Sequence, residues 1–304
     1  MRQRLLFGPV LIALLLAALW LDVVVDRLPS PGFLVRAGVL DQTLPRGVVI
    51  LLACAALSIL AARELATILR AKGITASTRL MCAASGLGLI VSSTVPEWTR
   101  GPTGVAVVST AGIAVLMTSL AFFSRHRSTE GVVAATGGML LAFVYLGLAL
   151  GFVPALRREC TVWFLLWILA VTKCSDIGAY FTGRAIGKHK LILWLSPGKT
   201  WEGLVGGIVL AAGAGALGIH LLNRFDDETG LTPLKGALSG AFFAVVGQLG
   251  DLMASTLKRD AGKKDASSVL PGFGGVLDVL DSPLLVVPVA YWWLPLLAAT
   301  PLTH

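Results

Sequence analysis

Three aspartates in the last quarter of the sequence have the types and spacing of a metal-binding group. Asp251 lies near the end of an apolar run, and Asp278 and Asp281 follow a Pro-Gly-x-Gly-Gly turn that could fold the chain back toward Asp251. Carboxylates held together repel one another unless a cation lies among them, and Mg²⁺ prefers oxygen ligands of this kind. The spacing therefore predicts that these three side chains bind Mg²⁺, directly or through water, and leaves a second cation open.

Basic and hydroxyl side chains flank this group. Ser255, Lys258 and Arg259 follow Asp251 at helical spacing and would share one helix face with it. Ser255 is expected to hydrogen-bond a phosphate or the ligands of the metal. The positions expected to bind phosphates are Lys199, Lys258, Arg259 and Lys264, with Asp265 in support. A carboxylate-bound metal beside clustered cations suits phosphoryl or nucleotidyl transfer.

Two upstream segments carry further polar groups. Lys173 and Asp176 are three residues apart and can pair on one helix face. In Ser-Pro-Gly-Lys-Thr-Trp-Glu-Gly, Ser196 is expected to cap a helix that begins after Pro197, with Lys199 and Thr200 near its phosphate-attracting end. The upstream glycine of a P-loop is absent, so the Gly-Lys-Thr triplet does not indicate that nucleotide-binding motif.

The rest of the chain is strongly apolar, and it must position these groups in a membrane. Of the 304 residues 56% are hydrophobic and 14% are charged, whereas about a quarter of the residues in soluble domains are charged. We expect an all-α, polytopic bundle of about nine transmembrane helices, because the apolar runs reach the length that crosses a bilayer. The runs are 5–25, 47–69, 79–96, 104–123, 131–153, 162–182, 201–222, 234–256 and 283–301. The first is expected to be an anchor rather than a cleaved leader.

Charge fixes the predicted orientation. With the N-terminus in the cytoplasm, the inside segments hold about twice as many Lys and Arg as the outside ones. Both strongly charged loops, 183–200 and 257–282, then face the cytoplasm. The net charge of +8 is spread among apolar spans, which indicates attraction to anionic lipid headgroups rather than to nucleic acid.

The two halves of the chain differ in chemistry. The predicted spans within residues 1–160 hold few ionisable groups apart from Arg63 and Glu64, which are expected merely to reach the interface. This half is predicted to be a transmembrane scaffold. Residues 161–304 are predicted to be the catalytic region of the same continuous membrane domain. Glycines on the later helices are expected to allow close packing, and a homodimer through them is left open.

The motifs from 173 to 282 closely resemble the signature of the phosphatidate cytidylyltransferase family, also called CDP-diacylglycerol synthases. The matching pieces are Asp176-x-x-Ala-Tyr180, Ser196-Pro-Gly-Lys-Thr-Trp-Glu-Gly203, Gln248-x-Gly-Asp251, Ser255-x-x-Lys258-Arg259, Lys264-Asp265 and Pro271-Gly-x-Gly274-Gly275-x-x-Asp278-x-x-Asp281-Ser282. Their number and order make the resemblance specific.

The resemblance implies that CTP and phosphatidate react to give CDP-diacylglycerol and pyrophosphate, assisted by Mg²⁺, at the cytoplasmic face of a bacterial inner membrane. It also implies that substrates contact Asp176, Tyr180, Ser196, Lys199, Thr200, Gly274 and Gly275. The chain departs from the family pattern at two positions, where Phe273 replaces a usual His and Val279 a usual Arg. Two alternatives stay open: a transporter or flippase of an anionic lipid, and a catalytically impaired paralogue.

Overall fold

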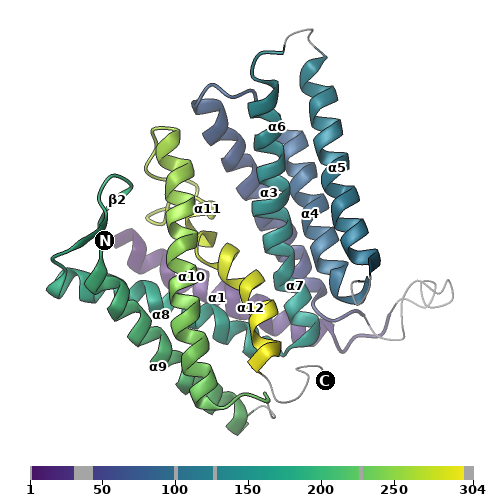
Figure 1. The fold of residues 1–304 in the computed structure, drawn as a ribbon. Coiled ribbons are helices and arrows are strands. Elements are labelled where there is room, and N and C mark those ends of the chain that lie inside the picture. Colours follow the sequence, from purple (N-terminus) through teal and green to yellow (C-terminus); the bar gives the residue numbers. More distant parts are fainter. Residues whose placement is uncertain (1, 31–43, 99–101, 126–128, 226–228, 298–304) are drawn as a thin grey trace. The chain divides into compact units, whose positions relative to one another are not determined.

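The computed structural model describes residues 2–30, 44–98, 102–125, 129–225 and 229–297, and Figure 1 shows that helices dominate. The helices are α1 (Arg2–Val25), α3 (Val48–Ala71), α4 (Thr78–Trp98), α5 (Pro102–Ser124), α6 (Val132–Leu141), the π-helix η1 (Ala142–Leu148), α7 (Ala149–Glu159), α8 (Val162–Ile186), α9 (Trp201–Phe225), α10 (Pro233–Asp260), α11 (Val276–Leu280) and α12 (Pro283–Leu297). The strands are β1 (Lys190–Ile192) and β2 (Ser196–Thr200). The predicted all-α membrane fold is confirmed.

Eight helical segments of the described chain are long and apolar enough to cross a membrane, so the chain is a multi-pass membrane protein. They match the predicted runs except the third, which forms α4. The fifth run is continuous through α6, η1 and α7, and the last begins earlier than predicted, at Val276. The predicted end of that last run, 298–301, lies outside the described residues.

Helix α4 is less apolar than its neighbours because its small side chains pack against another helix. Ser85, Ser92 and Ser93 are buried, and a Cβ atom added at Gly88 would lie 2.4 Å from the carbonyl oxygen of Phe143 in η1. The Ser58 and Ser85 hydroxyls also hydrogen-bond at 2.6 Å between α3 and α4. Small residues thus let helix backbones approach, and buried hydroxyls find partners.

The chain forms two compact units, of which the first contains Met1–Arg158 and Asp265–Val276. In this unit α1 packs on α3, and α4 packs on α3, α5 and η1. The buried Arg157 guanidinium donates to Asp22 at 2.8 Å and to Asp26. Asp22 also accepts the backbone N–H of Ile50, which ties α1 to the start of α3.

The second unit contains Glu159–Lys264 and Leu277–His304, and its core is the packing of α8, α9, α10 and α12. Glycines permit the close approach. A Cβ atom at Gly178 of α8 would lie 2.8 Å from the Gly206 carbonyl oxygen, and one at Gly215 of α9 would lie 2.2 Å from that of Gly236 in α10. The predicted roles of the two sequence halves, scaffold and catalytic region, stay predictions.

The segment before α9 corrects one prediction. Ser196 does not cap a helix; it lies in the antiparallel hairpin of β1 and β2, paired with Ile192. Helix α9 begins at Trp201, and the Thr200 hydroxyl accepts the backbone N–H of Gly203 at 3.1 Å. Thr200 is therefore the N-cap residue, and a short hairpin precedes the helix.

Candidate active site

The centre of the candidate site is Asp251 on α10, which contacts a cation and a second carboxyl group. Lys199 Nζ, at the end of the hairpin, lies 2.5 Å from Asp251 Oδ2. The side chains of Asp251 and Asp281 lie close enough to interact electrostatically. Asp281 is 8% exposed, and its Oδ1 accepts the backbone N–H of Ser282 at 2.7 Å. Residues from the hairpin, α10 and the segment after α11 thus converge within the second unit.

Helix α8 adds Asp176 and Lys173 to this neighbourhood. Lys173 Nζ lies 3.1 Å from Asp176 Oδ2, as the sequence spacing predicted. Asp176 also interacts electrostatically with Asp251 and Lys199, and Lys173 with Asp281. The side chains of Lys173 and Asp176 are each 46% exposed, so this pair lies at the open edge of the group. We call Lys173, Asp176, Lys199, Asp251 and Asp281 the carboxylate–lysine cluster.

Asp278 is directed to a different partner. Its Oδ1 lies 2.6 Å from Lys258 Nζ, and both side chains are only 9% exposed. Within the described residues, no three His, Cys, Asp or Glu side chains are arranged so that they could hold a metal ion. The structure therefore brings Asp251 and Asp281 together, while Lys258 binds Asp278.

The donor set of the cluster nevertheless fits Mg²⁺. Two carboxyl groups in contact repel each other when both are ionised, unless a cation lies between them. Mg²⁺ is usually held by one or two carboxylates, with water and substrate phosphates completing its coordination. Asp251 and Asp281 supply such a pair, and Asp251, at 31% side-chain exposure, remains open to a ligand.

The other predicted site residues differ in their exposure to solvent. Thr200 is buried, and its hydroxyl serves the N-cap described above. Tyr180 is exposed, and its hydroxyl accepts from the Arg184 guanidinium at 3.0 Å. Ser196 and Ser255 are half-buried, whereas Arg259, Lys264 and Asp265 are exposed. The exposed groups are accessible to a soluble ligand. Their roles in binding substrate remain predictions.

The glycine-rich turn has a defined backbone geometry in the first unit. Leu270 and Gly274 exchange two backbone hydrogen bonds, of 2.8 and 3.0 Å. Gly272 and Gly274 adopt φ angles of 82° and 92°, which favour glycine. The Phe273 ring lies against α1 at Gly8: a Cβ atom added at Gly8 would lie 3.6 Å from Phe273 Cζ, which is an ordinary van der Waals contact. The residue that departs from the family pattern is thus an apolar packing residue.

The prediction that Glu64 merely reaches the membrane interface is wrong. Glu64 is only 6% exposed. Its Oε1 accepts the Ser267 hydroxyl at 2.6 Å and the Val276 backbone N–H at 2.9 Å. No local sequence signal indicates these contacts, because the partners lie 203 and 212 residues away along the chain.

The pairing of His189 with Glu202 was also missed. Glu202 accepts the His189 backbone N–H at 3.2 Å, and its Oε1 lies 2.6 Å from His189 Nδ1. The Trp201 backbone N–H donates to the His189 carbonyl oxygen at 3.0 Å. These contacts join the start of the hairpin to the start of α9, so they hold the strand that ends near Lys199.

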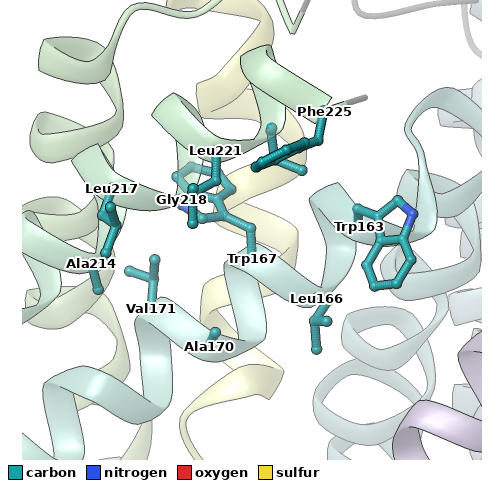
Figure 2. A pocket seen from close by; sticks show the side chains of 11 residues that line it. Trp163, Leu166, Trp167, Ala170, Val171, Ala214, Leu217, Gly218, Leu221 and Phe225 are labelled. Carbon is teal, nitrogen blue, oxygen red and sulfur yellow. The ribbon is translucent and has the colours of Figure 1, made fainter. Parts of the chain in front are cut away.

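A groove of about 550 Å³ lies between α8 and α9, and no residue of the cluster lines it. Figure 2 shows Trp167 directed from α8 toward Gly218 and Leu221 of α9, among other apolar side chains. The Trp167 indole N–H donates to the Gly215 carbonyl oxygen at 3.2 Å. Hydrocarbon chains of the bilayer suit such a groove, so we assign no chemistry to it.

Comparison with known proteins identifies the family. The model of the cytidylyltransferase family matches residues 33–297. The chain is 36% identical to phosphatidate cytidylyltransferase of Bacillus subtilis over 53% of this chain and 58% of that protein. It is 43% identical to phosphatidate cytidylyltransferase of Haemophilus influenzae over 42% of this chain and 44% of that one. It is also 38% identical to the uncharacterized protein YnbB of Escherichia coli, over 43% of this chain and 42% of that protein.

The chain spans about half the length of these curated relatives. The family model, in contrast, covers most of the chain, including every residue of the cluster. The chain belongs to the cytidylyltransferase family.

Proposed function

We propose that the chain is a phosphatidate cytidylyltransferase, which converts CTP and phosphatidate into CDP-diacylglycerol and pyrophosphate. The observation that carries the proposal is the contact of Asp251 with both Lys199 and Asp281. It joins a carboxylate pair suited to Mg²⁺ and a lysine suited to phosphate. The activity named for two of the relatives supports the choice of substrates.

In the proposed reaction, a phosphate oxygen of phosphatidate attacks the α-phosphorus of CTP. A new phosphorus–oxygen bond forms, the bond to the β-phosphate oxygen breaks, and pyrophosphate leaves with that electron pair. The lipid phosphate is already an anion, so the protein needs no strong general base. Its tasks are to bring two polyanions together and to stabilise the leaving group.

The residues divide these tasks. Lys199, Arg259 and Lys264 are proposed to bind phosphates, and Ser255 to donate a hydrogen bond to one of them. Asp251 and Asp281 are proposed to hold Mg²⁺, with Asp278 in contact through water and Asp176 in support. Mg²⁺ bound there would offset the charge on the phosphates and on the departing pyrophosphate.

The predicted orientation suits this reaction. We propose that the cluster faces the cytoplasm of a bacterial cell, at the inner membrane, where CTP is available. The lipid would reach the cluster laterally from the bilayer. The bias of Lys and Arg toward one set of loops supports this orientation.

The direct test is to incubate the purified protein with labelled CTP, phosphatidate and Mg²⁺ and to extract the lipid. Labelled lipid should appear, should disappear with a chelator and should return when Mg²⁺ is added. Asp281→Asn should lower kcat by about 10²–10³, the usual cost of losing one group that stabilises transition-state charge. Asp260→Asn, at an exposed position of α10, is the matched control and should keep the activity. Absence of labelled lipid from the unaltered protein under broad conditions would refute the proposal.

A second candidate is a family member with altered substrate preference or reduced activity. It is favoured by the packing of Phe273 on α1, because an apolar ring cannot donate the hydrogen bonds of the usual His. Phe273→His combined with Val279→Arg should then raise the rate with phosphatidate, whereas another lipid phosphate should react faster with the unaltered protein. If the protein moved an anionic lipid from one leaflet of a vesicle membrane to the other and formed no labelled lipid, it would instead be a transporter.

A further inference from the structure

Glu64 is a buried carboxylate outside the carboxylate–lysine cluster. It lies in α3, where its side chain is nearly inaccessible to solvent. A buried charged group is costly unless it is hydrogen-bonded, so the bonds that it makes must be favourable. The neighbouring Arg63, in contrast, is exposed.

The Glu64 bonds hold the glycine-rich loop at both of its ends. Before the turn, the Ser267 hydroxyl donates to Glu64 Oε1 and accepts the Val269 backbone N–H at 3.2 Å. After the turn, the Val276 backbone N–H donates to the same Oε1. One oxygen atom therefore fixes two points of the loop, and both contacts lie within the first unit.

Gly275 fits against the same carboxylate. A Cβ atom added at Gly275 would lie 2.5 Å from Glu64 Oε2 and 2.7 Å from Oε1, closer than Cβ atoms come to such atoms in proteins. Gly275 is not among the described residues with positive φ. Its lack of a side chain is thus explained by the space that Glu64 occupies.

We propose that Glu64 is a positioning residue, which sets the conformation of the loop 267–275 and the point at which α11 begins. Val276 is the first residue of α11, Asp278 follows in the same helix, and Asp281 lies just beyond its end. A shift in the position at which α11 begins would therefore displace both aspartates. Glu64 touches no reacting atom; it acts through the loop. The inference rests on the proposed transferase function.

Three substitutions separate the bond from the charge. Glu64→Gln keeps a carbonyl oxygen that can take the place of Oε1, Glu64→Asp keeps the charge but shortens the reach, and Glu64→Ala removes both. We expect Gln to retain most of the kcat. Asp and Ala should lose on the order of 100-fold, as for reacting groups misplaced by about 1 Å. The matched control is Arg63→Gln, which should behave like the unaltered protein.

The Mg²⁺ dependence gives a readout that a general loss of folding would not move. In Glu64→Asp protein that remains folded, the Mg²⁺ concentration that gives half-maximal activity should rise by about tenfold or more. Groups that orient metal ligands change metal affinity by about 10–100-fold. The KM for CTP should change less. If Glu64→Asp instead had the kcat and Mg²⁺ dependence of the unaltered protein and Glu64→Gln lost activity, the proposal would be overturned. The negative charge, and not the hydrogen bonds to the loop, would then be the property that matters.

Gly275→Ala tests the contact from the other side. Alone, it should reduce kcat because its methyl group displaces the Glu64 carboxylate. Combined with Glu64→Ala, it should add little, because the carboxylate that it would meet is gone. Independent, multiplicative losses would show that the two residues do not act through one contact.

Hydrogen–deuterium exchange tests the loop without any turnover. Backbone amides of 267–276 should exchange faster in Glu64→Asp and Glu64→Ala than in the unaltered protein, Glu64→Gln and Arg63→Gln. Unchanged exchange in the Asp and Ala variants would refute the proposal even if the activity fell. If the unaltered protein makes no labelled lipid, the transferase proposal fails, while the exchange data still decide whether Glu64 holds the loop.

Discussion

Replacing Asp278 with Asn should destabilise the protein, because it breaks a buried ion pair. Lys258 Nζ and Asp278 Oδ1 are 2.6 Å apart, and each side chain is 9% exposed. Removal of one partner from such a pair leaves a buried charge without compensation and costs about 3–5 kcal/mol. Lys258→Met should cost a similar amount, since it leaves the carboxylate buried. In Lys258→Met/Asp278→Asn the loss should be well below the sum of the two single losses.

The assay is unfolding in detergent micelles, followed by tryptophan fluorescence in a denaturant series without substrate or Mg²⁺. The Lys173–Asp176 pair is a matched control, because it has the same charges but both side chains are 46% exposed. Exposed pairs at helical spacing contribute about 0.3–0.5 kcal/mol, so Asp176→Asn should change the stability little. Strictly additive losses at Lys258 and Asp278, or equal effects of Asp278→Asn and Asp176→Asn, would refute the reasoning.

Two further predictions concern the hairpin and the start of α9. Lys199→Met should raise the KM for CTP and lower kcat in the labelled-lipid assay, because Lys199 Nζ is the cation bound to Asp251; Lys199→Arg should keep part of the activity, and an unchanged rate for Met would contradict a phosphate-binding role. Thr200→Ala should lower the unfolding free energy by about 1 kcal/mol through loss of the N-cap bond, whereas Thr200→Ser keeps the hydroxyl and should unfold like the unaltered protein. Equal stability of the Ala and Ser variants would show that the hydroxyl does not act as the cap.

The helices could be predicted because crossing a bilayer demands length and low polarity, which sequence displays directly. The start of α9 could not. Ser196 and Thr200 are both residues that favour the N-cap position, and local preference does not choose between them. The choice depends on the pairing of β1 with β2 and on the contact of His189 with Glu202, which only the folded chain shows.

The grouping of the three aspartates was predicted from the glycine-rich turn, which could fold the chain back toward Asp251. The turn alone does not say which aspartate meets which partner, because α11 ends at Leu280, between Asp278 and Asp281. Asp281 therefore meets Asp251 while Asp278 meets Lys258. Glu64 was misjudged for another reason: its burial depends on a loop more than 200 residues later in the sequence.

The glycine contacts between α8 and α9 make the thickness of the bilayer relevant to activity. Each helix has 25 residues, about 37 Å of helix, which is longer than the roughly 30 Å of hydrocarbon in a typical membrane. Such helices tilt to match the bilayer. Backbones in direct contact at Gly178 and Gly206 cannot tilt separately, so the two helices should respond together. Asp176 on one helix and the hairpin carrying Lys199 before the other would keep their spacing, and lipids of different chain length should alter access to the cluster more than its internal geometry.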